Sequence, residues 1–268
     1  MKTIYIILLL TLSIFSCQAQ IIQVNDMEEA LPYFQAADAH TLAIFDIDMV
    51  LVQPSDPAFQ MANMKRHSTI CKGIMKQIPP DKQMIFLSLM TVRSSPVLID
   101  PRMPEYLNHI MQSGCGEMAL TANLTGELDG IQNMQERRIE SLRALGIDFS
   151  KAAPYHQSIV FDNLASYRGN YSVYLDGILF VNGTVVSKGE ALVAFLQKTK
   201  STPTKIIFID DREENLKDLE VAIKKLDRPI AYQGLHFLGA QKYPSTMLTE
   251  QEFEARWKEL ASAAMSMS

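Results

Sequence analysis

The fold is decided by the stretch LAIFDID, residues 42–48, and by the similar stretch IIFIDD, residues 206–211. Each begins with four consecutive apolar residues, the pattern of a strand that helices cover on both faces. Each ends in a pair of acidic residues. Elsewhere, short apolar runs alternate with segments of helical period, which is typical of strands and helices that alternate around a parallel sheet. The sequence therefore predicts an α/β fold with a parallel central sheet flanked by helices.

The other elements are predicted from periodicity and turn residues. Further strands are expected at 118–120, 158–161, 171–174, 178–181, 184–186 and 230–232. Helices are expected at 57–78, 105–112, 131–145, 187–196, 211–226 and 250–264, whereas the apolar run 84–90 fits either type. Ser187 with Glu190, and Asp211 with Glu214, have the spacing of capping boxes. The side chains expected to pack the last helix on the domain are Phe253, Trp257 and Leu260.

The composition is that of an ordinary globular protein. The 268 residues are 47% apolar and 21% charged, and 25 basic against 30 acidic side chains give a net charge of −5. Such a chain can bury a large core without a metal or disulfide framework. Because no basic block occurs, we expect no sequence-independent binding to nucleic acid. Neither C-x-x-C nor H-x-x-x-H spacing occurs, which excludes the usual zinc motifs, and pairing of Cys71 with Cys115 is left open.

The N-terminus has the pattern of a secretory signal peptide. Lys2 precedes an apolar run, residues 4–15, which is too short to span a bilayer and is followed by small or polar residues. We expect residues 1–19 to be removed after Ala19, which leaves a mature domain at 20–268 without a transmembrane span. The alternatives are cleavage before Cys17, where residues 14–17 resemble a lipoprotein box, and retention of the run as an anchor helix. Cleavage at either site predicts an exported protein, periplasmic or secreted, with a lipid anchor in the case of Cys17.

The chemistry is predicted at the ends of the two decisive strands. Open α/β sheets bind ligands beyond the carboxyl ends of their strands. Acids brought together there repel one another unless a cation lies among them, and hard oxygen ligands suit Mg²⁺. A phosphoryl group beside such an ion can be attacked in line by a carboxylate, which gives an aspartyl-phosphate intermediate.

Four motifs, in order, resemble those of the haloacid dehalogenase-like (HAD) phosphohydrolases. Residues 46–51, DIDMVL, resemble the first motif, D-x-D-x-T/V, after a buried strand. Thr121 closes a strand as motif II, and Lys188 opens a helix as motif III. Asp210 and Asp211 close a strand as motif IV. The resemblance covers nearly the whole mature chain and implies a HAD-like (Rossmannoid) domain in an uncharacterised exported bacterial branch, with no characterised enzyme matched closely.

The resemblance implies a role for each of these residues. Asp46 would be the nucleophile, and Asp48 the general acid/base that protonates the leaving oxygen and later activates water. Thr121 would bind a phosphoryl oxygen, while Lys188 would neutralise charge on the phosphate and on Asp46. The ligands of Mg²⁺ would be Asp46, the backbone carbonyl of Asp48, and Asp210, Asp211 or both.

The expected function follows from the same resemblance. HAD proteins differ mainly in the insertions between their motifs, and helical periodicity indicates a small helical cap insertion at 53–112. An open site would admit a phosphoprotein as well as a small phosphorylated substrate. The expectation is an exported Mg²⁺-dependent phosphatase, a hydrolase of phosphomonoesters. The alternative is a catalytically inactive HAD-like binding protein that acts through its surface.

Each site residue also has a purely structural alternative. Asp48 would suit the start of a turn, Thr121 the end of a strand, and Asp211 the N-cap of a helix. Lys188 is the most telling, because the helix macrodipole disfavours a cation in the first turn by ~0.3–1 kcal/mol. A solvated lysine remains the alternative there, since Glu190 would offset that penalty.

Mass spectrometry of protein from fractionated cells tests the export prediction. We expect a mature N-terminus at Gln20 or a lipidated Cys17 in the exported fraction, because small residues precede the first position and a lipoprotein-like box ends at the second. An intact Met1 terminus on soluble cytoplasmic protein would contradict the prediction.

Overall fold

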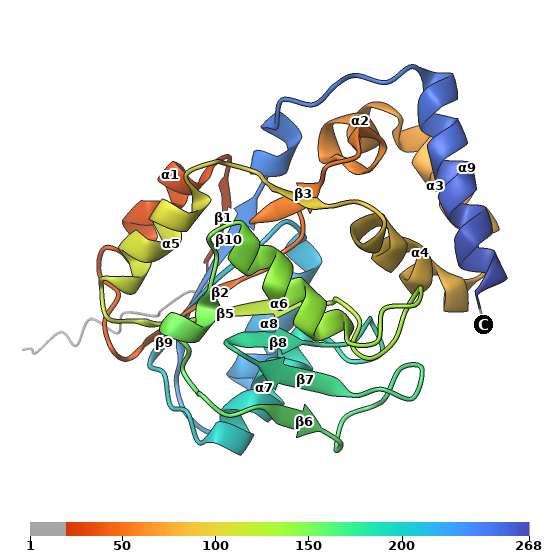
Figure 1. Ribbon diagram of the computed structural model, residues 1–268. Coiled ribbons are helices and arrows are strands. Elements are labelled where there is room, and N and C mark those ends of the chain that lie inside the picture. The colour runs from red at the N-terminus through yellow and green to blue at the C-terminus, as the bar shows by residue number, and fades with distance from the viewer. Residues whose placement is uncertain (1–19, 268) are drawn as a thin grey trace, which may run out of the picture.

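The central element is an eight-stranded sheet, seen in a computed structural model that describes residues 20–267 (Figure 1). Its spatial order is β1-β10-β9-β2-β5-β8-β7-β6. The strands are β1 Gln20–Val24, β2 Thr41–Phe45, β5 Gly116–Thr121, β6 Ile159–Phe161, β7 Ser172–Leu175, β8 Ile178–Phe180, β9 Lys205–Asp210 and β10 Ala231–Phe237. The predicted signal peptide, residues 1–19, lies outside the described residues. In this spatial order, neighbouring strands are parallel from β1 through β10, β9, β2 and β5 to β8. Strand β7 pairs antiparallel with both of its neighbours, β8 and β6.

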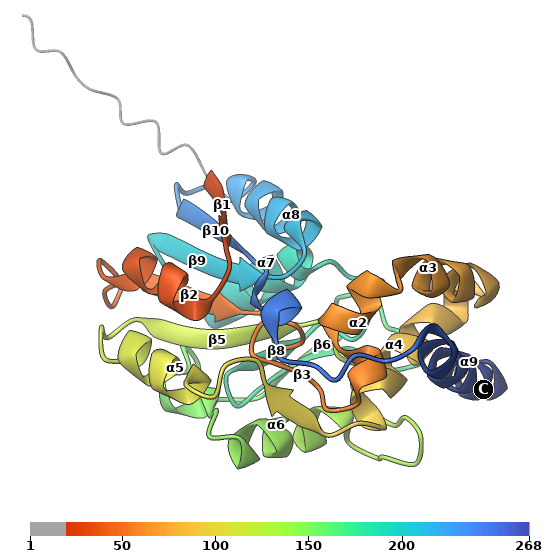
Figure 2. The same cartoon turned by 90° about the horizontal axis from the view of Figure 1, so that it is seen from above.

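Helices cover both faces of this sheet, which confirms the predicted α/β class (Figure 2). On one face lie α1 Met27–Ala30, the 3-10 turn η1 Leu31–Phe34, α5 Met103–Met111 and α6 Met134–Ala144. On the other lie α7 Lys188–Thr199 and α8 Glu213–Lys224. Along β2, Ala43 and Phe45 enter the first core while Leu42 and Ile44 enter the second, because successive side chains of a strand point to opposite faces. This alternation explains why the four consecutive positions 42–45 of the strand are all apolar.

A separate group of helices lies between β2 and β5 in the chain. It follows the short strand β3 Val52–Pro54 and comprises the 3-10 turn η2 Pro57–Phe59, α2 Met61–Arg66, α3 Ser68–Gln77 and α4 Pro80–Val92, before β4 Pro96–Leu98. Strands β3 and β4 pair antiparallel. Because α5 packs on the sheet, this helical group is smaller than the 53–112 segment in which the sequence predicts an insertion.

The C-terminal helix α9, Glu250–Ser266, completes the helical group rather than covering the sheet (Figure 1). Its side chains Phe253, Trp257 and Leu260 are buried, as expected, but against α3 and α4. Thr249 begins the helix with a capping box to Glu252. We refer to α2, α3, α4 and α9 together as the helical cap group.

Several local predictions are wrong. The expected helix 57–78 is broken at His67, which lies between α2 and α3 with a non-helical backbone. Residues 184–186 form no strand, so the meander ends at β8. Asp211 does not cap α8, because the N-cap residue is Arg212. Strand β1, which the sequence analysis missed, pairs with β10 at the sheet edge.

Within residues 20–267, no helix is both long and apolar enough to cross a membrane.

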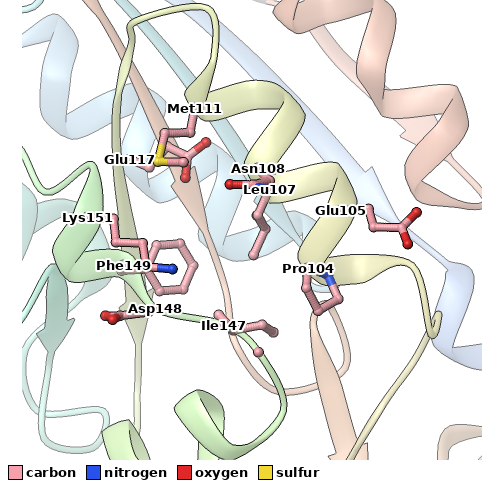
Figure 3. A pocket seen from close by; sticks show the side chains of 11 residues that line it. Pro104, Glu105, Leu107, Asn108, Met111, Glu117, Ile147, Asp148, Phe149 and Lys151 are labelled. Atoms are coloured by element: carbon pink, nitrogen blue, oxygen red, sulfur yellow. The ribbon is translucent and has the colours of Figure 1, made fainter.

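A cavity of about 180 Å³ lies at the amino end of β5, where Glu117 points toward Met111 and Asn108 of α5 (Figure 3). Glu117 is 4% exposed, and its Oε1 atom has no hydrogen-bond partner in the described residues. Burial raises the pKa of the Glu117 carboxyl to about 8. The native protein therefore carries this side chain in its neutral form at neutral pH.

This raised pKa predicts a pH-dependent effect of Glu117→Gln on stability. The native state binds a proton at Glu117 that the unfolded state releases, so the contribution of Glu117 to stability falls as pH rises from about 4.5 to about 8. We expect Glu117→Gln to match the wild type near pH 4 and to exceed it by a few kcal/mol near pH 9. Urea denaturation at both pH values measures this. Glu105→Gln, an exposed change in the same cavity, is the control, and equal stability of the wild type and Glu117→Gln at pH 9 would contradict the prediction.

Candidate functional site

The candidate site lies at the carboxyl ends of three adjacent strands. Asp46 directly follows β2, Thr121 is the last residue of β5, and Asp210 is the last residue of β9. In the pairing register Phe45 lies opposite Ile209, so Asp46 and Asp210 are the next neighbours across the two strands. The Asp46 backbone N–H extends this pairing by donating to the Ile209 carbonyl at 2.9 Å. The parallel register thus brings acids from two distant motifs together.

Lys188 joins these two acids. Its Nζ atom lies 2.8 Å from Asp46 Oδ1 and donates a hydrogen bond to Asp210 Oδ2 at 2.7 Å. The lysine is only 6% exposed, which excludes the solvated alternative. Burial alone would lower the pKa of Lys188, but the carboxylates of Asp210 and Asp46 raise it above its ordinary value. The amine therefore remains a buried cation.

The start of α7 is built to hold Lys188 in this position. The Ser187 hydroxyl accepts a hydrogen bond from the Glu190 backbone N–H at 3.1 Å and so caps the helix. A Cβ atom at Gly189 would lie 2.7 Å from the Cβ of Ala222, so only glycine lets α7 approach α8 this closely. The Gly189 N–H also donates to Asp218 of α8. These contacts fix the first turn of α7 against its neighbour and direct the lysine into the site.

Three carboxylates form a group that could hold a metal ion. One ligand oxygen each of Asp46, Asp210 and Asp211 lies within 4.8 Å of the others. With Lys188 as the only cation in ion-pair contact with them in the described residues, three negative charges and one positive charge leave a formal charge of −2. Burial, together with the charge of Asp210, raises the pKa of Asp46 to about 7, although Lys188 opposes this. Burial and the same neighbouring acids also raise the pKa of Asp211. A divalent cation would balance this charge.

The two acids of the last motif have different surroundings. Asp210 is fully buried and accepts hydrogen bonds from the Arg212 backbone N–H at 2.8 Å and from the Asn215 amide at 3.0 Å, besides Lys188. The Asp211 carboxylate accepts no hydrogen bond within residues 20–267, while its backbone carbonyl contacts His236. The carboxylate oxygens of Asp211 therefore have fewer hydrogen-bond partners than those of Asp210. Oxygens without such partners fit the role of metal ligands.

Asp48 occupies a turn that separates its side chain from that of Asp46. The backbone N–H groups of Leu51 and Val52 both donate to the Ile47 carbonyl, at 3.0 and 3.1 Å, and Met49 adopts a left-handed φ of 64°. Asp48 thus lies in a turn, but its carboxylate also contacts residues outside that turn. The carboxylate stays outside the three-acid group and does not contribute a side-chain ligand to it.

Two residues that the sequence analysis did not assign hold Asp48. The Asn123 amide donates to Asp48 Oδ2 at 2.7 Å, and the Arg138 guanidinium forms an ion pair with Oδ1. Arg138 is 9% exposed and lies on the buried stripe of α6 between Met134 and Leu142. A charged residue on an otherwise apolar helical stripe was the available sequence indication, because such a side chain needs a buried partner.

Thr121 is 1% exposed at the end of β5. Its hydroxyl oxygen accepts a hydrogen bond from the Asn123 backbone N–H at 3.2 Å, so the hydroxyl proton can still be donated to a ligand. A pocket of about 310 Å³ opens in front of these side chains, and Asp46, Asp48, Thr121 and Asp211 line its polar end. The structure therefore brings all six predicted site residues to one region of the molecule.

Loss of the buried cation should destabilise the fold. We expect Lys188→Met to lower the free energy of unfolding by about 3–5 kcal/mol, because it leaves Asp46 and Asp210 buried without their partner. Lys217→Met is the matched control, since Lys217 is ion-paired to Glu213 but 60% exposed, and it should cost less than about 1 kcal/mol. Urea denaturation without added metal compares them, and equal losses in both variants would show that the buried ion pairs do not stabilise the protein.

Comparison with known proteins gives a family but no function. A family described as "Protein of unknown function (DUF2608)" matches residues 23–267. Proteins of Rickettsia bellii and Rickettsia felis, both named only as uncharacterised, are 23% identical over 246 residues, which cover 88% of this chain and 82% of each relative. An uncharacterised protein of Rickettsia prowazekii is 28% identical over 135 residues, 50% of this chain and 45% of the relative. No solved structure matches.

Proposed function

We propose that this chain, which belongs to the DUF2608 family of unknown function, is an exported Mg²⁺-dependent phosphohydrolase of the HAD type that hydrolyses phosphomonoesters through an aspartyl-phosphate. The observation that carries the proposal is the position of Lys188, buried between Asp46 and Asp210. A structural role alone would not require a third acid, Asp211, within the same few ångströms, because that acid adds repulsion and its carboxylate has no hydrogen-bond or ion-pair partner in the described residues. A cluster of acids of this kind is expected where the protein binds a cation.

The first half of the proposed reaction uses Asp46 as the nucleophile. Its Oδ1 atom is occupied by the Ile47 N–H at 2.8 Å and by Lys188, which leaves Oδ2 without a partner in the described residues. Oδ2 attacks phosphorus in line, the bond from phosphorus to the leaving oxygen breaks, and Asp48 supplies the proton that makes the leaving group an alcohol. The products of this step are the free alcohol and a phosphorylated Asp46.

The second half restores the enzyme. Asp48, now ionised, takes a proton from water, and the resulting hydroxide attacks phosphorus and displaces Asp46 as a carboxylate. The ion pair with Arg138 and the hydrogen bond from the Asn123 amide hold the Asp48 carboxyl in a fixed position at the pocket. One carboxylate thus serves as acid and then as base, as microscopic reversibility requires.

Lys188 and Thr121 bind the phosphoryl group in this proposal. Lys188 offsets negative charge on phosphoryl oxygens from a fixed position, and Thr121 donates its hydroxyl proton to one of them. Mg²⁺ would be held by Asp46, the Asp48 backbone carbonyl, and Asp211 with or without Asp210. When bound, the ion neutralises charge that develops on the transferred phosphoryl group.

Replacing Asp46 by Asn tests the proposal. Turnover of a panel of phosphomonoesters in the presence of Mg²⁺ should fall at least ~10³-fold, because the attacking carboxylate and one metal ligand are lost. Without Mg²⁺ the melting temperature should stay unchanged or rise, since repulsion from Asp210 and Asp211 is relieved. Added Mg²⁺ should raise the melting temperature of the native protein more than that of the variant.

The exposed substitution Asp162→Asn is the matched control and should change neither rate nor melting temperature. A native phosphatase rate in the Asp46→Asn variant would refute the assignment of Asp46 as the nucleophile. A native protein that gains stability with Mg²⁺ yet hydrolyses no phosphomonoester would favour the alternative, a HAD-like binding protein without turnover.

A further inference from the structure

Methionine side chains surround the far end of the pocket that holds the candidate catalytic acids. Six methionines of the described residues line it, together with Leu87 and Trp257. The six are Met49, Met61, Met64, Met75, Met84 and Met90. Five come from α2, α3 and α4 of the helical cap group, and one from the turn after β2. The pocket is therefore polar where the strands end and apolar where the helices cover it.

These apolar side chains are not simply part of a closed core. Met61, Met64, Met75 and Met84 are half-buried, and Leu87 is 40% exposed. Apolar surface left in contact with water is unfavourable, and a concave patch of it commonly marks a binding site. Methionine also suits a ligand site, because its flexible, polarizable side chain adapts to varied apolar shapes. The volume, about 310 Å³, lies within the range of about 300–1,000 Å³ of small-molecule sites.

We propose that this methionine-lined end binds an apolar group of the substrate, so that the enzyme prefers phosphomonoesters of long-chain alkyl alcohols. The proposal rests on the proposed function, because the phosphate is positioned by the acids and Lys188 at the other end of the same pocket. A sugar or a base would need several hydrogen-bonding side chains around it. The helical wall of the pocket offers chiefly Ser88 and Thr91, and Thr91 already donates to the Ser88 carbonyl.

Ser88 supplies a second observation. It is 5% exposed, lines the pocket, and its hydroxyl has no hydrogen-bond partner in the described residues. A buried hydroxyl without a partner is unfavourable in the empty protein. Because this hydroxyl is buried, it gives a sugar or a base no accessible hydrogen-bonding group, and the helical wall of the pocket stays apolar toward a ligand.

Trp257 makes binding directly measurable. It is the only tryptophan of the chain and it lines the pocket. Its indole N–H donates to the Ala58 carbonyl at 2.9 Å, and its ring centroid lies 5.2 Å from that of Phe86. These contacts fix the position of the side chain. A change in its fluorescence on addition of a ligand therefore reports occupation of this pocket.

The experiment uses the mature protein with Mg²⁺ and a series of methyl-, butyl-, hexyl- and octylphosphonates, which cannot be hydrolysed. Titration by tryptophan fluorescence should show a dissociation constant that falls about two- to fourfold per added methylene, since each buried methylene contributes ~0.8 kcal/mol at most. In parallel, kcat/KM for the matching alkyl phosphates should rise with chain length.

Two variants and a control locate the effect. Met75→Gln and Met84→Gln keep the side-chain length but add polarity, so they should weaken octylphosphonate at least fivefold and leave methylphosphonate unchanged. Met247→Gln, at a methionine that is 55% exposed and not among the pocket-lining residues, should leave all affinities unchanged. Circular dichroism melting checks that each variant is folded.

The outcomes separate the two proposals. Dissociation constants and kcat/KM values that do not change with chain length, in a protein that does hydrolyse phosphomonoesters, would overturn the apolar subsite and leave the phosphatase standing. A chain-length effect that persists unchanged in both methionine variants would overturn it too, because the chain would then bind elsewhere. Tight binding of octylphosphonate without hydrolysis of any phosphomonoester would support the subsite while refuting the proposed reaction.

Discussion

The structure depends on one buried cation shared by two buried acids. Lys188 lies between Asp46 and Asp210, and each of the three comes from a different element. A buried ammonium group or carboxylate without a partner strongly destabilises the protein. Each of β2, β9 and α7 is therefore stable in its position only when the other two are packed beside it. The same requirement that holds the fold together therefore assembles the acidic group. Structure and candidate chemistry share one set of contacts.

The helical cap group shows how distant segments complete this site. Helices α2, α3 and α4 follow the motif that carries Asp46, whereas α9 comes from the end of the chain (Figure 2). The two parts pack through one apolar cluster that includes Phe86 and Trp257. Removal of α9 would expose this cluster and open one wall of the pocket. The site is therefore built from segments that follow β2 and from the C-terminal helix, although all its acids come from strand ends or the turn after β2.

Much of this arrangement could be predicted from the sequence, because the relevant information is local. Unbroken apolar runs in β2 and β9 indicate buried parallel strands, and the acids that follow them must then gather at one edge. A lysine in the first turn of α7 is unfavourable unless something nearby attracts it. The contacts of Arg138 with Asp48 could not be predicted in the same way. Periodicity places Arg138 on a buried stripe but does not say which acid it meets, 90 residues away.

By itself, the sequence determined the α/β class, the parallel strands and the identity of the acids at their ends. Alternation of polar and apolar side chains acts over a few residues, so it can be recognised without knowing the fold. Only the tertiary structure decided that Asp210 is surrounded by donors while Asp211 is not, that Asp48 is held by Asn123 and Arg138, and that α9 covers α3 and α4. These outcomes depend on which surfaces meet after the sheet has formed. Burial and hydrogen bonding between segments far apart in the chain fix that choice, and no local pattern encodes it.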